Sequence, residues 1–152
     1  MSRIEIVEKP LPAVRLAART AIAAEQAEMS TIVGPAFDAV ADALNSVNAS
    51  LARPIAQYSS AEDGMQVTVG YEYSGPAIDG VEIIELPAVG TAVCGVHLGA
   101  MDGIQNSWMA LHEEIIARGF LPSGPCRELY VRAESDDQAD WVTELQQPVT
   151  RS

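Results

Sequence analysis

The sequence predicts an α+β fold made of two successive β-α-β-β units. Two segments, residues 34–51 and 102–119, carry apolar side chains at the three- and four-residue spacing of an amphipathic helix. A pair of segments with strand-like composition follows each helix. Two such units can join their sheets into one antiparallel sheet with both helices on one face and a ligand groove on the other. We therefore expect a single domain over residues 1–152, with pseudo-repeats at about 1–76 and 77–152.

The first half is predicted to begin with a short strand at residues 4–7 and a second one at residues 13–23. The alanine content of the second segment would also suit a helix. The helix at 34–51 is expected to start at Gly34-Pro35, because proline is favoured in the first turn of a helix. Its apolar stripe comprises Phe37, Val40, Leu44, Val47 and Leu51. After this helix, the Asp63-Gly64 pair predicts a hairpin turn between two strands.

The second half repeats this order. Its helix has an apolar stripe formed by Ile104, Trp108, Leu111 and Ile115. Asp102 is predicted to cap the start of the helix, with Gln105 in the reciprocal position, and Gly119 to end it. A closing hairpin over residues 126–149 follows, interrupted by an acidic loop.

Charge excludes one large class of partner. The chain carries 21 acidic and 9 basic residues, a net charge of −12, and it has no cluster of lysine and arginine that could neutralise several phosphates. Direct binding to nucleic acid is therefore not expected, whereas cationic partners are favoured electrostatically. The first residues lack the apolar run of a signal peptide, and no segment approaches the length of a membrane span. We expect a cytoplasmic protein with no membrane partner.

The motifs of common cofactor and metal sites are missing from the sequence. No phosphate-binding loop, GxGxxG or GxSxG motif occurs, and His97 and His112 lack metal-ligand spacing, so each is expected to be hydrogen-bonded or at the surface. Cys94 and Cys126 lack a CxxC arrangement; we expect two buried, unreactive thiols, with a disulfide as the alternative. No cofactor, no metal and no firm catalytic residue is predicted.

Glu128 is the most informative polar residue. It lies in "PCRELYV", where strand alternation puts Glu128 and Tyr130 on one face and Arg127 on the other. When the halves are aligned on their tyrosines, Ala56 occupies the equivalent place in the first half, so the carboxylate occurs once. Two interpretations remain open: a solvated strand face, or the floor of a pocket.

Aromatic residues make the pocket interpretation chemically specific. Tyr58, Tyr71 and Tyr130 lie on predicted hairpin strands, and Trp108 lies in the second helix, where core packing is the alternative role. A carboxylate among aromatic rings suits a flat organic cation, because ring faces attract cations and the carboxylate supplies the opposite charge. The predicted ligand-binding residues are Glu128, Tyr130, Trp108, Tyr71 and Tyr58.

Three motifs carry a family resemblance: the helix tryptophan with its following leucine, the strand "GPCRELY", and the terminal "WVTELQQPV". Together they resemble the GyrI-like small-molecule-binding domain, the effector-binding domain of multidrug-sensing MerR and AraC family regulators, which also occurs as free-standing proteins. The resemblance covers essentially the whole chain and is strongest over residues 81–149. It implies the duplicated fold with a groove between the halves, and it aligns Glu128 with the glutamate that recognises lipophilic cations. Tyr130 and Trp108 match pocket-lining positions, and Tyr71 supplies an aromatic ring from the first half.

One motif departs from the family pattern. Ala100 and Met101 stand where many members have the proline and tyrosine of a "GPY" motif, so one aromatic wall is replaced by a softer side chain. We expect no helix-turn-helix before the domain, and we expect any transcriptional role to need a separate regulator.

The resemblance leaves three functions open. We favour a stand-alone module that senses or sequesters hydrophobic, cationic, aromatic compounds. The first alternative is a hydrolase of cyclopropane-type electrophilic natural products, with Glu128 as general base and Tyr130 orienting the electrophile. The second is a protein-binding inhibitor, because the founding member of the family binds DNA gyrase.

Overall fold

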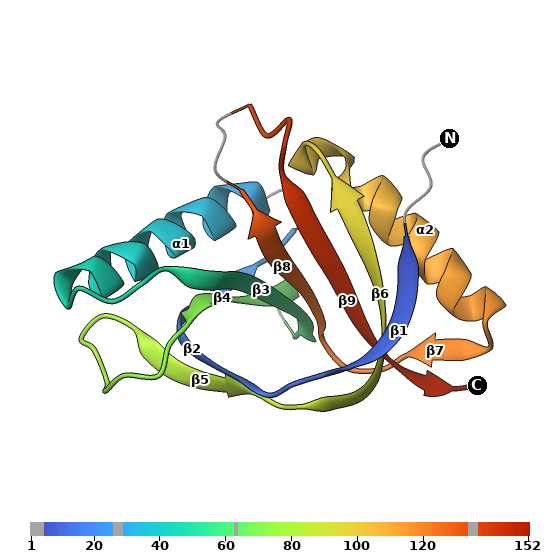
Figure 1. The fold of residues 1–152 in the computed structure, drawn as a ribbon, viewed down its shortest axis with the longest axis horizontal. Helices are drawn as coiled ribbons and strands as arrows, with labels where there is room; N and C mark the ends of the chain where they lie inside the picture. Colours follow the sequence, from blue (N-terminus) through green and yellow to red (C-terminus); the bar gives the residue numbers. More distant parts are fainter. Residues whose placement is uncertain (1–4, 26–28, 63, 134–136) are drawn as a thin grey trace. The chain divides into compact units, whose positions relative to one another are not determined.

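The computed structural model describes residues 5–25, 29–62, 64–133 and 137–152, which form two compact units. Unit 1 comprises Met1–Pro12 and Ala88–Ser152, and unit 2 comprises Ala13–Pro87. In its described part, each unit holds an antiparallel sheet and one α-helix packed against it (Figure 1). The predicted α+β class is therefore confirmed.

The sheet of unit 1 has the strand order β1-β6-β9-β8, and β7 pairs with the end of β9. The strands are β1 (Ile6–Leu11), β6 (Val89–Leu98), β7 (Phe120–Pro122), β8 (Cys126–Arg132) and β9 (Val142–Arg151). Helix α2 (Ile104–Ala117) packs on β6 and β7. Its buried face forms one core cluster with Val93 of β6 and Leu145 and Val149 of β9. These strand residues therefore mark the side of the sheet that α2 covers.

Helix α2 follows its predicted stripe but not its predicted start. Ile104, Leu111 and Ile115 are buried and Trp108 is half-buried, which confirms the stripe. The capping prediction is wrong, because a 3-10 turn, η2 (Met101–Gly103), precedes the helix and places Asp102 inside that turn. Gly103 therefore occupies the N-cap position, without a side-chain hydrogen bond.

The C-terminal end of α2 is as predicted. Gly119 follows the cap residue Arg118 and has a φ of 82°, the left-handed conformation that glycine adopts at helix ends.

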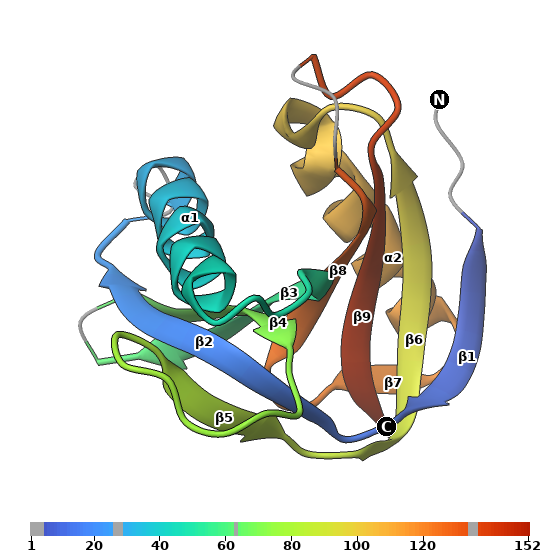
Figure 2. The same cartoon turned by 60° about the vertical axis from the view of Figure 1, so that its left-hand side comes forward.

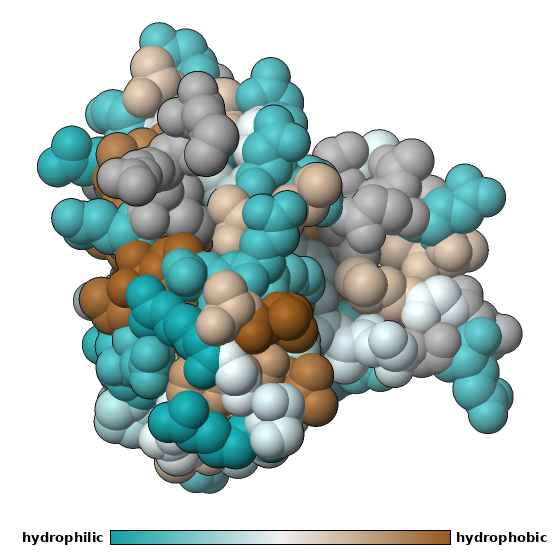
Figure 3. Space-filling model, turned by 90° about the vertical axis from the view of Figure 1, so that its right-hand side faces the viewer, coloured by the Kyte–Doolittle hydropathy of each residue, from teal (hydrophilic) through white to brown (hydrophobic). Residues whose placement is uncertain are grey.

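Large apolar side chains also remain exposed on unit 1. They are Met109 and Ile116 of α2, Val7 of β1, Leu98 of β6, Leu121 of β7 and Val131 of β8. In Figure 3, hydrophilic residues separate the apolar patches. Scattered apolar residues of this kind are normal on a folded protein and indicate no partner by themselves.

Unit 2 has the strand order β3-β4-β2-β5, with helix α1 (Met29–Ser46) packed on β2 and β4 (Figure 2). The strands are β2 (Val14–Ala23), β3 (Ala52–Ala61), β4 (Gly64–Glu72) and β5 (Glu82–Leu86). The strand prediction for residues 13–23 is confirmed over the helical alternative. Strands β2 and β4 approach each other closely and need small residues where they pair. A Cβ atom at Gly70 of β4 would overlap the backbone oxygen of Ala17 in β2.

The predicted start of the first helix is wrong. Helix α1 begins at Met29, and Pro35 lies inside it rather than in its first turn. The last part of the predicted stripe also fails, because the helix ends at Ser46 and both Val47 and Leu51 are exposed. Val40 and Leu44 are fully buried, as the periodicity predicts. The hairpin turn joins β3 and β4 as expected, although Asp63 lies outside the described residues, as does Ile4 of the first predicted strand.

The two units have the same topology. Each contains a strand, a helix and two further strands, β6-α2-β8-β9 in unit 1 and β2-α1-β3-β4 in unit 2, and the corresponding strands occur in the same sheet order. Each sheet adds an edge strand from the other predicted half: β1 pairs with β6, and β5 pairs with β2. The compact units therefore differ from the predicted halves by an exchange of these strands. In the described part of the chain, no helix has the length and hydropathy needed to cross a membrane.

Candidate functional site

The Glu128 carboxylate lies at the centre of a hydrogen-bonded group within unit 1. The indole Nε1–H of Trp108 donates to Oε2 over 2.7 Å, and the hydroxyl of Tyr130 donates to Oε1 over 2.6 Å. Both distances lie within the normal range of hydrogen bonds in proteins. The helix tryptophan and the E-x-Y strand that the sequence singled out therefore meet at one carboxylate.

Strand register determines which face carries this group. Glu128 of β8 pairs with Leu145 of β9, and Tyr130 pairs with Thr143. Residues directly opposite on antiparallel strands point to the same side of the sheet, and Leu145 belongs to the core cluster beneath α2. Glu128 and Tyr130 thus lie on the helix-covered face. These two residues therefore do not lie on the face that was expected to carry the ligand groove, and Trp108 reaches the carboxylate from the side on which α2 packs.

Arg127 lies on the other face, as strand alternation predicts. It pairs with Gln146 and is buried there, and burial lowers the pKa of its guanidinium. Glu128 itself is only 5% exposed, and Tyr130 only 8%. The interpretation of Glu128 as a solvated surface carboxylate is therefore excluded.

A second buried hydrogen-bonded pair holds α2 next to this site. His97 of β6 contacts the Ser107 hydroxyl through Nδ1 over 2.6 Å and the Ala100 carbonyl oxygen through Nε2 over 2.8 Å. Because a carbonyl oxygen can only accept, Nε2 carries a hydrogen and donates it to Ala100. This pair joins the first turn of α2 to β6, one residue before Trp108.

His97 is confirmed as hydrogen-bonded, but its partner was not predicted from the sequence. Strand alternation held part of the information. His97 pairs with Thr143, so its side chain faces the same side of the sheet as Tyr130 and α2. The second histidine, His112, lies on α2 near Trp108, with ring centroids 5.8 Å apart.

The other predicted aromatic residues belong to unit 2. Tyr71 of β4 is half-buried and contacts the Phe37 ring edge-on, with centroids 5.7 Å apart. Burial, together with the charge of Asp38, raises the pKa of its phenol. Tyr58 is half-buried on β3. A ligand-binding role for Tyr58 and Tyr71 stays a prediction.

Both cysteines are free thiols, so the disulfide alternative is wrong. Cys94 is buried in β6, and Cys126, half-buried, is the first residue of β8. Burial raises the pKa of each thiol to about 11, and the charge of Glu128 adds to the rise at Cys126. Both thiols are therefore poor nucleophiles at neutral pH, as expected.

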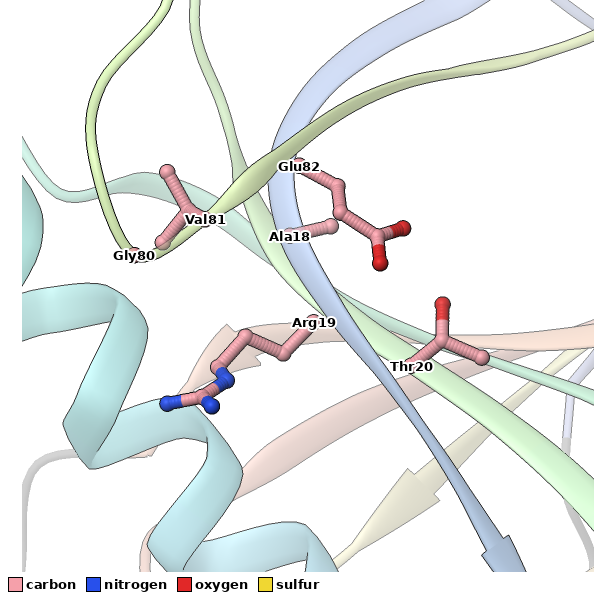
Figure 4. Close-up of a pocket in the computed structure, with 6 residues that line it drawn as sticks. All are labelled: Ala18, Arg19, Thr20, Gly80, Val81 and Glu82. Carbon is pink, nitrogen blue, oxygen red and sulfur yellow. The ribbon is translucent and has the colours of Figure 1, made fainter.

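Unit 2 contains an open hollow of about 320 Å³ beside β2 and the start of β5. Its lining residues are Ala18, Arg19, Thr20, Gly80, Val81 and Glu82, and the side chains of Arg19 and Glu82 point in different directions (Figure 4). None of the predicted site residues lines it. Among the described residues, no cluster of three histidine, cysteine or acidic side chains could hold a metal ion.

Comparison with protein families gives a direct match. A sequence profile for the GyrI-like small molecule binding domain matches residues 55–150. The chain belongs to the GyrI-like family. Comparison with curated protein sequences gave no significant match.

Solved structures agree with the GyrI-like fold. The C-terminal domain of EcmrR has a TM-score of 0.75 at 21% identity, with 98% of this chain and 99% of that chain covered. SAV2435, solved bound to tetraphenylphosphonium, has a TM-score of 0.68 at 20% identity, with 96% and 94% covered. A hydrolase from Listeria innocua has a TM-score of 0.64 at 12% identity, with 96% and 92% covered. At these identities the likeness establishes the fold of this GyrI-like protein.

Proposed function

We propose that this GyrI-like protein binds hydrophobic aromatic cations and that Glu128 recognises their charge. The observation that carries the proposal is the burial of the Glu128 carboxylate, 5% exposed, between the Trp108 indole and the Tyr130 phenol. The two rings offer faces for stacking and cation–π attraction, and the carboxylate offers the opposite charge.

The energetic cost of burying Glu128 supports a functional role. Removing a carboxylate from water costs several kcal/mol even after relaxation, and an apolar side chain of similar size is often neutral or stabilising in its place. Structure alone therefore gives little reason for an acid at this position, whereas a cationic ligand gives one. The net charge of −12 further favours the approach of cations.

A structural relative supports the class of ligand. SAV2435 was solved with tetraphenylphosphonium bound, and that ligand is an aromatic, lipophilic cation. We transfer the class of ligand to this protein, and not its identity.

Titration with a lipophilic cationic dye such as rhodamine 6G tests the proposal. We expect a change in dye fluorescence on binding and a more than tenfold weaker affinity for Glu128→Gln, equivalent to about 1.4 kcal/mol or more. Glu113→Gln is the matched control, because Glu113 is an exposed residue of α2 and its substitution removes the same charge. Equal affinity of wild type and Glu128→Gln would refute recognition of charge by Glu128.

A hydrolase is the second candidate. The 2.6 Å hydrogen bond from Tyr130 to Glu128 couples a phenol to a carboxylate that could act as general base, and one structural relative is described as a hydrolase. In this reaction the oxygen of water would bond to a strained cyclopropane carbon as the ring bond breaks, and Glu128 would take up one proton from that water. The electron pair of the broken bond would stay on the ring-opened part of the product, which would then take up a proton from solvent, so that one whole water is added. Incubation with a spirocyclopropane electrophile followed by mass spectrometry tests it. The product should gain the mass of one water with wild type and not with Glu128→Gln.

A further inference from the structure

We propose that Trp108 competes with the ligand for Glu128, so that a bound cation displaces the indole N–H from Oε2. This inference rests on the proposed binding function. It adds that the tryptophan, besides contributing a ring to the site, sets how strongly a ligand must attract the carboxylate in order to bind.

The neighbouring side chains restrict the access of a ligand to the Glu128 carboxylate. Glu128 is 5% exposed, and each carboxylate oxygen already accepts a hydrogen bond, from Trp108 or from Tyr130. The part of the Glu128 side chain that stays accessible is too small for an aromatic cation to contact the carboxylate. The ligand therefore reaches the carboxylate only when one of the neighbouring side chains moves.

Of the two side chains that are hydrogen-bonded to Glu128, Trp108 is the one that we expect to move. Tyr130 is buried on the same strand as Glu128, and it pairs with Thr143 of β9, which is fully buried. The Tyr130 ring is therefore enclosed by its neighbours and has little room to rotate. Trp108 is half-buried on α2 and reaches Glu128 from a separate element. Rotation of the half-buried indole about its side-chain bonds breaks its own hydrogen bond to Oε2.

Trp108 also has a role in the protein without ligand. The indole N–H serves as a polar partner that keeps the buried carboxylate hydrogen-bonded when no ligand is present. The loss of a hydrogen bond to a charged group changes an equilibrium constant by roughly tenfold to a hundredfold. Every ligand that displaces the indole loses this factor, so only ligands with a strong attraction to Glu128 bind detectably.

The indole hydrogen provides a direct readout. In a ¹⁵N-labelled protein, the Trp108 Nε1–H resonance is assigned by its loss in Trp108→Phe, and the Trp141 indole serves as internal reference. On saturation with methyltriphenylphosphonium, we expect the Trp108 resonance to move upfield and to exchange faster with solvent, because the hydrogen bond to the carboxylate is lost. A Trp108 resonance that stays in place while calorimetry shows the cation bound would overturn the proposal.

The affinity of Trp108→Phe is the second readout. Phenylalanine keeps an aromatic ring but removes the N–H that occupies Oε2, so methyltriphenylphosphonium should bind at least about threefold more tightly. Trp141→Phe is the control and should leave the affinity unchanged. Unchanged or weaker binding by Trp108→Phe would contradict competition by the indole. Absence of any binding to wild type by calorimetry would instead refute the proposed function, and this inference with it.

Discussion

The indole nitrogen of Trp108 lies 2.7 Å from Oε2 of Glu128, a residue 20 positions further along the chain. This contact joins helix α2 to strand β8 on the helix-covered face of unit 1. It makes the geometry of the carboxylate depend on how α2 is held against the sheet. The buried His97–Ser107 pair and the apolar face of α2 hold the helix there, and each can be tested separately.

Ser107→Ala should destabilise the protein by about 1–3 kcal/mol. The substitution removes the hydroxyl that is hydrogen-bonded to His97 Nδ1 and leaves a buried ring nitrogen without that partner. Asn106→Ala is the control, because Asn106 is exposed on the same helix and its loss should cost less than about 0.5 kcal/mol. Urea denaturation followed by circular dichroism measures both. Equal stability of the two variants would show that the pair contributes nothing.

Leu111→Ala should cost about 2–5 kcal/mol, since Leu111 is fully buried in the core cluster between α2 and the sheet. Met109→Ala removes a side chain of similar size from the same helix, but Met109 is 61% exposed, so the expected cost is below about 0.5 kcal/mol. The denaturation midpoints of the two variants should therefore differ clearly. Similar midpoints would mean that the face of α2 bearing Leu111 does not pack on the sheet.

Alkylation of Cys126 should depend steeply on pH. Burial, with a smaller contribution from the charge of Glu128, raises the pKa of the Cys126 thiol to about 11. The thiolate is the reactive form, so the rate with iodoacetamide in the native protein should still rise about tenfold per pH unit between about pH 7.5 and pH 9.5. Peptide mapping by mass spectrometry distinguishes Cys126 from the more deeply buried Cys94. A rate that levels off below about pH 9 would contradict the raised pKa.

Glu128→Gln should speed this alkylation at a fixed pH near 8, because removal of the nearby negative charge lowers the pKa of Cys126. The matched control Glu113→Gln should not change the rate. A Glu128→Gln variant that reacts more slowly than wild type would contradict the electrostatic link between the two residues.

Local patterns predicted much of the fold and of the site. Alternation along β8 correctly placed Glu128 and Tyr130 together and Arg127 apart, and helical periodicity correctly placed Trp108 on the buried side of α2. The core-packing interpretation of Trp108 holds in part, since its ring packs against the core cluster while its N–H contacts the Glu128 carboxylate. Its role in ligand binding stays a prediction.

Long-range relationships were the part that local patterns could not predict. Alternation divides the residues of a strand between two faces but does not say which face a helix will cover, so Glu128 was assigned to the wrong side. The pairing of β1 with β6 joins residues far apart in the chain, for example Ile6 with Gly95, and no local signal specifies it. The start of α1 was misplaced because Pro35, which favours a first turn, is accommodated inside this helix.

The central claim is that Glu128 recognises positive charge, and one calorimetric comparison tests it most directly. Methyltriphenylphosphonium and triphenylphosphine oxide share three phenyl rings on phosphorus but differ in net charge. We predict that wild type binds the cation at least about tenfold more tightly than the neutral compound, and that Glu128→Gln loses this preference. Equal affinities of wild type for the two compounds, or a preference that survives in Glu128→Gln, would contradict the account.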